Sequence, residues 1–200
     1  MSQAKPVLVL DFDGVIVSLD IDWPGLRQEI SVALKIEIDT FASFFEENFG
    51  KNDFERVSEL AKKVEFSAAE RAALYPDVKP ALELLRTHEI KTYVASMQSI
   101  DVLNFFLQKQ GISSYFVQVW GRESGGSKRF QLEQIKKIEQ QNSLGLEPNL
   151  VLIDDAKRNT VLASELGYAS ILFKRDSNGI SLVNVVRSVI EKSDSYTQGQ

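Results

Sequence analysis

Two pairs of acidic residues, one near each end of the chain, follow directly after continuous apolar runs. Asp11 and Asp13 close the segment VLVLDFDG, and Asp154 and Asp155 close the segment LVLIDD. Continuous apolar runs of this length are typical of strands that are buried on both faces of a parallel sheet. Ligands of such sheets bind beyond the carboxyl ends of the strands. We therefore expect the four carboxylates to border one binding crevice.

The spacing of the first pair favours metal chemistry. Side chains alternate along a strand, so Asp11 and Asp13 can point to the same side, with their Cα atoms about 6–7 Å apart. Asp155 adds a third carboxylate to this crevice. Such a cluster is costly unless a cation lies among the carboxylates or one of them stays protonated. Hard divalent cations prefer oxygen ligands, and Mg²⁺ is the cofactor that we expect.

Each pair also has a purely structural explanation. Asp13 and Gly14 lie between VLVL and VIV, which is a strong signal for a β-hairpin turn. Asp154 and Asp155 could equally cap the helix that follows them. Either pair alone leaves the choice open, but two pairs after two apolar strands favour a functional site.

Strand and helix patterns alternate through most of the chain. Strand patterns cover residues 7–13, 91–96, 115–120, 149–154 and 169–174. Helix patterns cover residues 78–88, 99–110, 128–141, 157–167 and 180–192. This alternation predicts βαβ units and an α/β fold with a parallel sheet.

Residues 18–75 interrupt the alternation and show helix patterns only. Asp22 precedes a Trp-Pro pair, as expected of an N-cap followed by proline in the first helical turn. Ser67 and Glu70 have the spacing of a capping box, which predicts that a short helix opens there and stops before Pro76.

An aromatic stripe marks one helical face of this insertion. Its members follow the spacing i, i+3, i+4, i+8 and are Phe41, Phe44, Phe45 and Phe49. We interpret the stripe mainly as the packing core of the insertion. One or two of its rings could still face the binding crevice.

Four segments, taken in order, resemble the motifs of the haloacid dehalogenase superfamily. DFDGV is similar to the first motif, an Asp-x-Asp-x-(Thr/Val) signature. YVASM ends a strand with Ser96, as in the second motif, and GGSKRF supplies Lys128, as in the third. VLIDDAKRN is similar to the paired-Asp form of the fourth motif, with Asn159 as its later polar residue. The series spans nearly the whole chain, and its order makes it much more specific than any single motif.

The resemblance implies both a fold and a division of the chain. The fold is a Rossmann-like α/β fold with a parallel sheet of strand order 5-4-1-2-3, in which the strands that carry the first, second and fourth motifs are neighbours. Residues 1–17 and 76–200 would form the catalytic core. Residues 18–75 would form an inserted α-helical cap.

The resemblance also assigns catalytic and phosphate-binding residues. Asp11 is the expected nucleophile, which forms an aspartyl-phosphate. Asp13 is the expected general acid for the leaving group and then the base that activates water. Ser96 and Lys128 are expected to bind the phosphoryl group.

Two of these assignments compete with simpler explanations. Ser96 could cap the next helix, and Lys128 could be a solvated residue beside Arg129. A cation in the first turn of a helix opposes the helix dipole, so Lys128 needs an anionic partner. Met97 departs from the Asn that is frequent next in the second motif, which puts one side-chain contact in doubt.

The metal site is expected to use three aspartates and two supporting residues. Asp11, Asp13 and Asp155 are the expected Mg²⁺ ligands. Asp154 would orient Lys128 or a metal-bound water. Asn159 would hold another metal-bound water.

The chemistry that follows is hydrolysis of a phosphomonoester. The resemblance implies that Asp13 excludes dehalogenation, because a halide leaving group needs no proton and dehalogenases of the superfamily lack this residue. We therefore expect a phosphatase that acts on a small phosphorylated metabolite. A phosphomutase would share every catalytic residue. A non-catalytic phosphate-binding or regulatory protein is the alternative from another class.

Composition narrows the partners and the location. The 200 residues carry a net charge of −5, which argues against a surface that coats nucleic acid. No apolar run approaches the ~18 residues that span a membrane, and MSQAKP lacks the apolar region of a secretory leader. The absence of cysteine excludes disulfides and thiolate sites and is compatible with the cytoplasm, where we expect the protein. The single histidine, His88, is expected to satisfy carbonyls at a helix end. Oligomeric state is left open.

Overall fold

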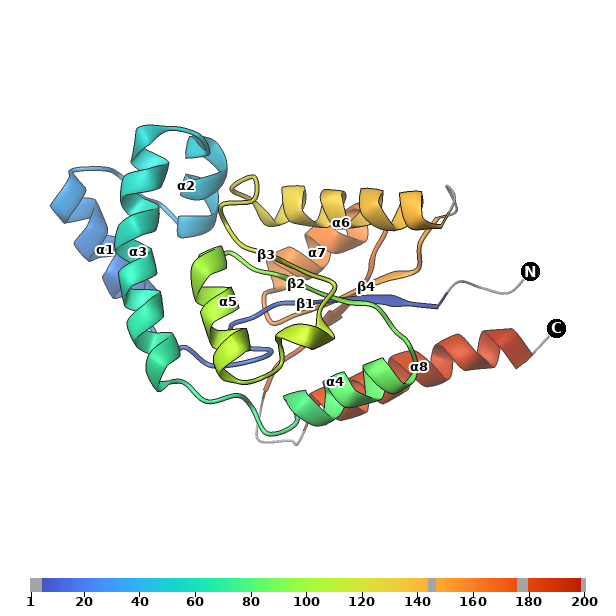
Figure 1. The fold of residues 1–200 in the computed structure, drawn as a ribbon. Coiled ribbons are helices and arrows are strands. Elements are labelled where there is room, and N and C mark those ends of the chain that lie inside the picture. Colours follow the sequence, from blue (N-terminus) through green and yellow to red (C-terminus); the bar gives the residue numbers. More distant parts are fainter. Residues whose placement is uncertain (1–4, 144–146, 176–179, 199–200) are drawn as a thin grey trace.

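The computed structural model describes residues 5–143, 147–175 and 180–198 and contains a five-stranded parallel sheet (Figure 1). The strand order is β3-β2-β1-β4-β5, which is the predicted order written from the other edge. The strands are β1 (Val7–Leu10), β2 (Thr92–Ala95), β3 (Gln118–Trp120), β4 (Leu150–Asp154) and β5 (Ala169–Leu172). The α/β fold class and the strand order are therefore confirmed.

Alternate residues of the central strands face two separate hydrophobic layers. Leu8 and Leu10 of β1 pack with α4 (Val78–Thr87), α5 (Ile100–Lys109) and α8 (Leu182–Gln198). Val7 and Val9 pack with α6 (Lys128–Asn142) and α7 (Lys157–Glu165) on the opposite face. Burial on both faces explains why these strands are continuous apolar runs.

The alternative explanation of Asp13 and Gly14, a hairpin turn after β1, is wrong. Strand β1 pairs in parallel with β2 and β4, and Val17 instead bridges antiparallel to Leu74. Gly14 turns the chain with a φ of +83°, and a Cβ atom there would lie 2.7 Å from the side chain of Asp155. Glycine is needed at this position because the backbone is left-handed and because the two motif loops approach closely.

Three helices form a lobe at one end of the molecule (Figure 1). They are α1 (Trp23–Leu34), α2 (Phe41–Asn48) and α3 (Asn52–Arg71). The lobe has its own hydrophobic cluster, which includes Phe44, Phe45 and Phe54. Asp22 caps α1 as predicted, since its carboxylate accepts from the N–H of Gly25 at 3.1 Å.

The predicted capping box at Ser67 is wrong, because α3 runs through it without a break. The Ser67 hydroxyl accepts from Arg71 at 2.6 Å, one turn later in the same helix. The second half of α3 leaves the lobe and packs on the core, where Ala68 and Ala69 join the layer beneath the sheet. Burial of these alanines keeps the helix continuous where local sequence signals favour a new start.

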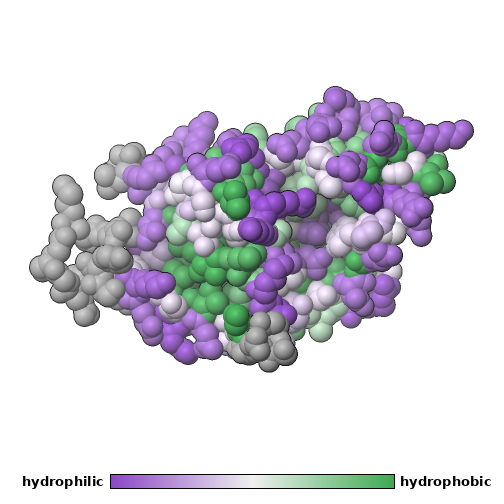
Figure 2. Space-filling model, turned by 180° about the vertical axis from the view of Figure 1, so that it is seen from behind, coloured by the Kyte–Doolittle hydropathy of each residue, from purple (hydrophilic) through white to green (hydrophobic). Residues whose placement is uncertain are grey.

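Figure 2 shows the molecule from behind, with hydrophobic side chains gathered over the core and hydrophilic ones predominating on the lobe. Within the described part of the chain, no helix has the length and apolar character required to cross a bilayer. His88 lies just after α4, and its ring Nδ1 is 2.9 Å from the Leu84 carbonyl, in agreement with the structural role predicted for it.

Candidate active site

A cavity of about 570 Å³ separates the carboxyl ends of the central strands from the lobe. Its core wall contains Asp11, Asp13, Ser96, Lys128, Asp155 and Asn159. Its lobe wall contains Trp23, Arg27, Phe41, Phe45 and Glu65. The fold thus brings the residues of all four sequence motifs to one cavity, as the strand-end rule predicts.

Lys128 is the electrostatic centre of the cavity floor. Its Nζ lies 3.0 Å from Oδ1 of Asp11 and 3.0 Å from Oδ2 of Asp154, and it also donates to the carbonyl of Ala95. Burial alone would lower the pKa of Lys128, but the two carboxylates raise it above its ordinary value. The side chain is 5% exposed, whereas its neighbour Arg129 is exposed and pairs with Glu165. The solvated-lysine alternative is therefore wrong.

Asp154 is fully occupied by donors. Oδ1 accepts from the N–H of Ala156 at 2.9 Å, and both oxygens lie 3.0 Å from Nδ2 of Asn159. Lys128 is a further donor to this carboxylate. The donors hold the carboxylate in one orientation and compensate its charge at a completely buried position. Asp154 therefore fixes the ammonium group of Lys128 beside Asp11.

Burial makes the other carboxylates hard to ionise together. It raises the pKa of Asp11 to about 7, a rise that Lys128 opposes and Asp154 increases. Burial also raises the pKa of Asp155, and the adjacent Asp154 carboxylate adds to that rise. A cation placed between Asp11 and Asp155 would relieve this cost.

Asp13 lies in a different environment, which reaches into the lobe. Its Oδ1 accepts from the N–H of Leu19 at 3.0 Å, and its Oδ2 accepts from the indole Nε1 of Trp23 at 3.3 Å. Burial raises the pKa of Asp13, and these two hydrogen bonds oppose the rise. Asp11 and Asp13 thus differ in partners, as expected of two carboxylates with different tasks.

The loop after β2 presents free donors to the cavity. Ser96 does not cap α5, whose N-cap position is Ser99; its hydroxyl instead donates to the side-chain carbonyl of Gln98, and its N–H bonds to the Trp120 carbonyl. Among the residues that the structure describes, the N–H groups of Met97 and Gln98 have no hydrogen-bond partner. The two free N–H groups can bind an anion such as a phosphoryl group, and the Ser96 hydroxyl can join them once it turns away from Gln98.

The carboxylates fit a hard divalent cation. Asp11, Asp154 and Asp155 each offer an oxygen within 4.8 Å of the others. Asp154 is already held by donors, but Asp155 accepts no hydrogen bond from the described residues, and one oxygen of Asp11 is free of Lys128. Two available carboxylate oxygens beside a water-accessible cavity suit Mg²⁺, which keeps several waters. Asp13 is outside this group, so its ligation of the metal stays a prediction.

Local sequence patterns did not identify several residues of the site. Trp23 was visible only as a helix-start residue, although its indole contacts Asp13. Glu65 and Gln98 line the cavity, and Arg122 lies behind it as a buried partner of Glu65. Only the prediction that some aromatic rings of the lobe reach the crevice pointed to this wall, and Phe41 and Phe45 do line it.

Comparison with known families gives a match over most of the chain. A family model described as haloacid dehalogenase-like hydrolase matches residues 26–173. The matched range contains the second, third and fourth motifs and begins after the first. Among curated proteins, none matches the chain by sequence.

Solved structures share the fold over nearly their whole length. A haloacid dehalogenase-like hydrolase from Streptococcus pneumoniae is 14% identical, with a TM-score of 0.62 and coverage of 98% of this chain and 100% of that one. A phosphatase of the same superfamily from Thermococcus onnurineus is 18% identical, with a TM-score of 0.58 and coverage of 92% and 97%. A predicted phosphoglycolate phosphatase from Haemophilus somnus is 18% identical, with a TM-score of 0.57 and coverage of 94% and 99%. At this identity, the likeness shows a common fold.

Proposed function

Because the chain belongs to the family of haloacid dehalogenase-like hydrolases, we propose that it is a phosphatase that hydrolyses a small phosphorylated metabolite. Two of the structurally similar proteins are described as phosphatases. The substrate would bind with its phosphoryl group on the floor of the cavity. Its remaining part would face the lobe.

In the proposed reaction, Asp11 attacks phosphorus and forms an aspartyl-phosphate while the bond to the leaving oxygen breaks. Asp13 gives its proton to that oxygen. Asp13 then accepts a proton from the water that hydrolyses the aspartyl-phosphate, which returns both residues to their starting states. The different partners of Asp11 and Asp13 support this division of roles.

A cation, a hydroxyl and N–H groups on the cavity floor would stabilise the phosphoryl charge in this reaction. Lys128 and Ser96, with the free N–H groups of Met97 and Gln98, would bind the phosphoryl oxygens. A bound Mg²⁺ would supply further positive charge and help to place the phosphoryl group for in-line attack. We propose Asp11, Asp13 and Asp155 as the residues that hold the ion, with Asp154 and Asn159 as the residues that orient its surroundings.

The observation that carries the proposal is the position of Lys128. A buried ammonium group 3.0 Å from Asp11, fixed by Asp154 and facing the cavity, is what a carboxylate nucleophile and a transferring phosphoryl group require. A structural ion pair alone would not need a cavity beside it. The nearby Asp13 supplies the acid that an alkoxide leaving group needs.

The lobe would act as a cap that selects the substrate. We propose the division made from the sequence, with residues 18–75 as the cap and residues 1–17 and 76–200 as the core. The aromatic side chains of Trp23, Phe41 and Phe45 on the lobe wall suit a leaving group with an apolar surface.

The experiment is a phosphate-release screen with sugar phosphates, nucleotides, phosphoglycolate and phosphoamino acids, each with and without Mg²⁺. The Asp11→Asn variant, purified in the same way, controls for contaminating phosphatases. The proposal expects at least one substrate that releases phosphate only with wild-type protein and Mg²⁺. Isomerisation of a sugar phosphate without phosphate release would instead indicate a phosphomutase, and no turnover of any ester would overturn the proposal.

A further inference from the structure

A second buried ion pair lies behind the cavity, where helix α3 of the lobe meets the core. Arg122, in the loop between β3 and α6, and Glu65, in α3, are each only 1% exposed. Nη1 of Arg122 lies 2.6 Å from Oε1 of Glu65. Burying two opposite charges costs several kcal/mol per ion before their attraction repays it. The pair therefore calls for an explanation beyond stability.

Arg122 binds both the lobe and the loop after β2. Its Nε and Nη2 donate to the hydroxyl and the carbonyl of Ser58 in α3, at 2.8 and 3.0 Å. Its Nη1 also donates to the carbonyl of Met97 at 3.3 Å. Met97 directly follows Ser96 and carries one of the two free N–H groups. The guanidinium group therefore holds the proposed phosphate-binding loop from behind.

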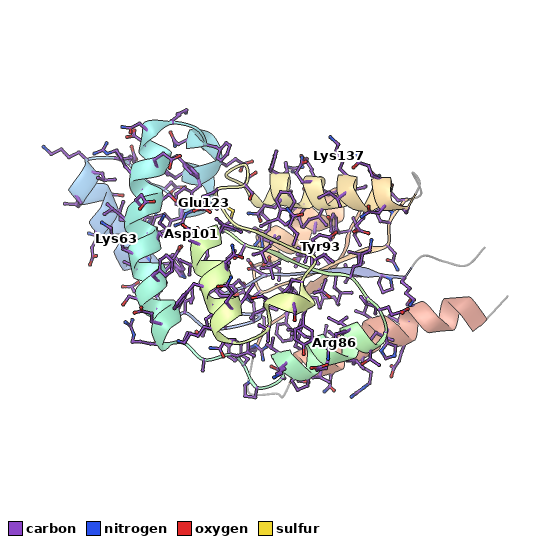
Figure 3. The ribbon with its side chains drawn as sticks, in the orientation of Figure 1. Lys63, Arg86, Tyr93, Asp101, Glu123 and Lys137 are labelled. Atoms are coloured by element: carbon purple, nitrogen blue, oxygen red, sulfur yellow. The ribbon has the colours of Figure 1, made fainter. Side chains whose placement is uncertain are left out.

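Two carboxylates hold the other end of this loop. Oε2 of Glu65 accepts from the N–H of Ser99 at 3.1 Å, and Oε2 of Glu123 accepts from the N–H of Ile100 at 2.8 Å. Oε1 of Glu123 lies 3.9 Å from Nε of Arg122, so the guanidinium group lies near both carboxylates. Figure 3 shows Glu123 where α3, the start of α5 and the loop before α6 come together. Negative groups are favourable at this position because they face the N-terminus of α5.

The hydrogen bonds of successive N–H groups divide the loop into occupied and free parts. The N–H groups of Ser96, Ser99 and Ile100 are occupied by the Trp120 carbonyl, Glu65 and Glu123. Those of Met97 and Gln98, between them, are free in the described structure. Glu65 also lines the cavity. The lobe helix α3 thus helps to decide which N–H groups of the core are left for a ligand.

We propose that Arg122 and Glu65 are positioning residues, which hold the loop 96–99 so that the N–H groups of Met97 and Gln98 point at the phosphoryl group. The inference rests on the proposed phosphatase function. Its structural basis, the immobilised loop, can be measured separately. The pair also links the lobe to the phosphate-binding loop through buried contacts instead of through surface contacts alone.

The decisive variant replaces the pair by apolar residues, Arg122→Met with Glu65→Leu. Replacing a buried ion pair by apolar residues of similar volume is often neutral or stabilising. Here the Ser99 N–H and the Met97 carbonyl also lose their partners, so we expect a loss of stability of about 1–3 kcal/mol and compare turnover well below the melting temperatures of both proteins. Turnover should nevertheless fall about 10–100-fold, because misplacement of reacting groups by ~1 Å has that effect. Glu65→Gln keeps an acceptor for Ser99 and should retain more of the turnover than the double variant.

A matched control is the ion pair between Lys91 and Glu139, 2.8 Å apart at the opposite end of β2. Lys91→Met with Glu139→Leu should leave turnover within about twofold of wild type. If the apolar double variant of Arg122 and Glu65 turned over as fast as this control, the positioning role would be overturned. If that double variant failed to fold, Arg122→Lys would decide, because it keeps a cation beside Glu65 but loses the guanidinium contacts to Ser58 and Met97. Unchanged turnover with unchanged loop exchange in that variant would overturn the role.

Amide hydrogen exchange and binding of inorganic phosphate separate the inference from the proposed function. The amides of Ser99 and Ile100 should exchange at least tenfold faster in the apolar double variant, and inorganic phosphate should bind at least tenfold more weakly. Both measurements can be made even if the wild-type protein hydrolyses no ester. Failure to hydrolyse any ester would overturn the proposed function but not the positioning role. Unchanged exchange and unchanged phosphate binding would overturn the positioning and not the function.

Discussion

The indole N–H of Trp23, at the start of the first lobe helix, donates to Oδ2 of Asp13 in the core at 3.3 Å. The other carboxylate oxygen of Asp13 accepts from the N–H of Leu19, so both of its oxygens are fixed by residues on the way into the lobe. The residue that we propose as acid and base is therefore oriented by the part of the chain that would select the substrate.

Trp23→Phe should lower kcat by about tenfold and change KM little, because it removes the donor to Asp13 and keeps an aromatic ring in the cavity wall. Steady-state kinetics on the best substrate measures both quantities. Trp120→Phe is a matched control, since the buried Nε1 of Trp120 has no hydrogen-bond partner among the described residues. Equal kcat values for the two variants would contradict an orienting role for Trp23.

Asp11→Asn should lower phosphate release by about 10³-fold or more while leaving the melting temperature near that of wild type, because the amide has the same shape but is a poor nucleophile. Asp53→Asn, a change in the first turn of α3, is the control and should keep full activity. Activity of the Asp11 variant above a few per cent of wild type would rule out Asp11 as the nucleophile.

Removal of divalent metal with EDTA should abolish turnover, and Mg²⁺ should restore it. Ca²⁺ should restore it poorly, because its larger and looser coordination shell misplaces an in-line attack. Binding can be followed without activity, since Mg²⁺ should raise the melting temperature of wild type and less so that of Asp155→Asn. Full turnover in EDTA would show that the acidic cluster is no metal site.

Lys128→Met should destabilise the fold by about 3–5 kcal/mol, because it leaves Asp11 and Asp154 buried without their cation. Urea unfolding at pH 7 measures this loss. Lys137→Met, an exposed change on the same helix (Figure 3), should change the free energy of unfolding by less than about 0.5 kcal/mol. Equal stability of the two variants would show that the buried ammonium group contributes nothing to the fold.

Glu139 should make the fold sensitive to acid. Burial raises the pKa of Glu139, but hydrogen bonds from Lys91 at 2.8 Å and Tyr93 at 2.5 Å outweigh it and lower the pKa below its ordinary value of 4.5. A carboxyl group with a lowered pKa stabilises the fold above its unfolded pKa and loses this contribution as pH falls. Wild type should thus exceed Glu139→Gln in stability at pH 7, and the difference should shrink below about pH 4.5.

Unfolding curves for wild type and Glu139→Gln between pH 7 and pH 3 measure this difference. Glu133→Gln, an exposed change on the same helix α6, is the control and should show no such dependence. A stability difference that stayed constant over this range would contradict a lowered pKa for Glu139.

Patterns that repeat within one element predicted the framework well. The apolar runs before Asp11 and Asp154 predicted the two central strands β1 and β4. Strands that are covered on both faces need apolar residues at every position. The prediction was less accurate at the edge of the sheet beyond β2. β3 begins at Gln118 and not at residue 115, because Ser113–Tyr115 form a 3-10 turn.

Contacts between distant segments could not be predicted from the sequence. Arg122 and Glu65 are 57 residues apart, and no periodic pattern joins a loop to a helix over that distance. Ser67 shows the opposite failure, since a good local signal for a helix start was overridden by packing of the same helix on the core. The motif residues were found because their types and order carry the information.

Helix α3 belongs to two hydrophobic clusters, with Phe54 and Val57 in the lobe and Ala68 and Ala69 in the core. One continuous helix therefore joins the packing of the lobe to the packing of the core. Melting of the whole twenty-residue helix would expose alanines beneath the sheet. We expect thermal unfolding in one cooperative transition. A substitution that weakens the packing of either cluster should then lower the free energy of unfolding of the whole molecule. Sequence change in the lobe would then be limited by the stability of the whole molecule as well as by the substrate.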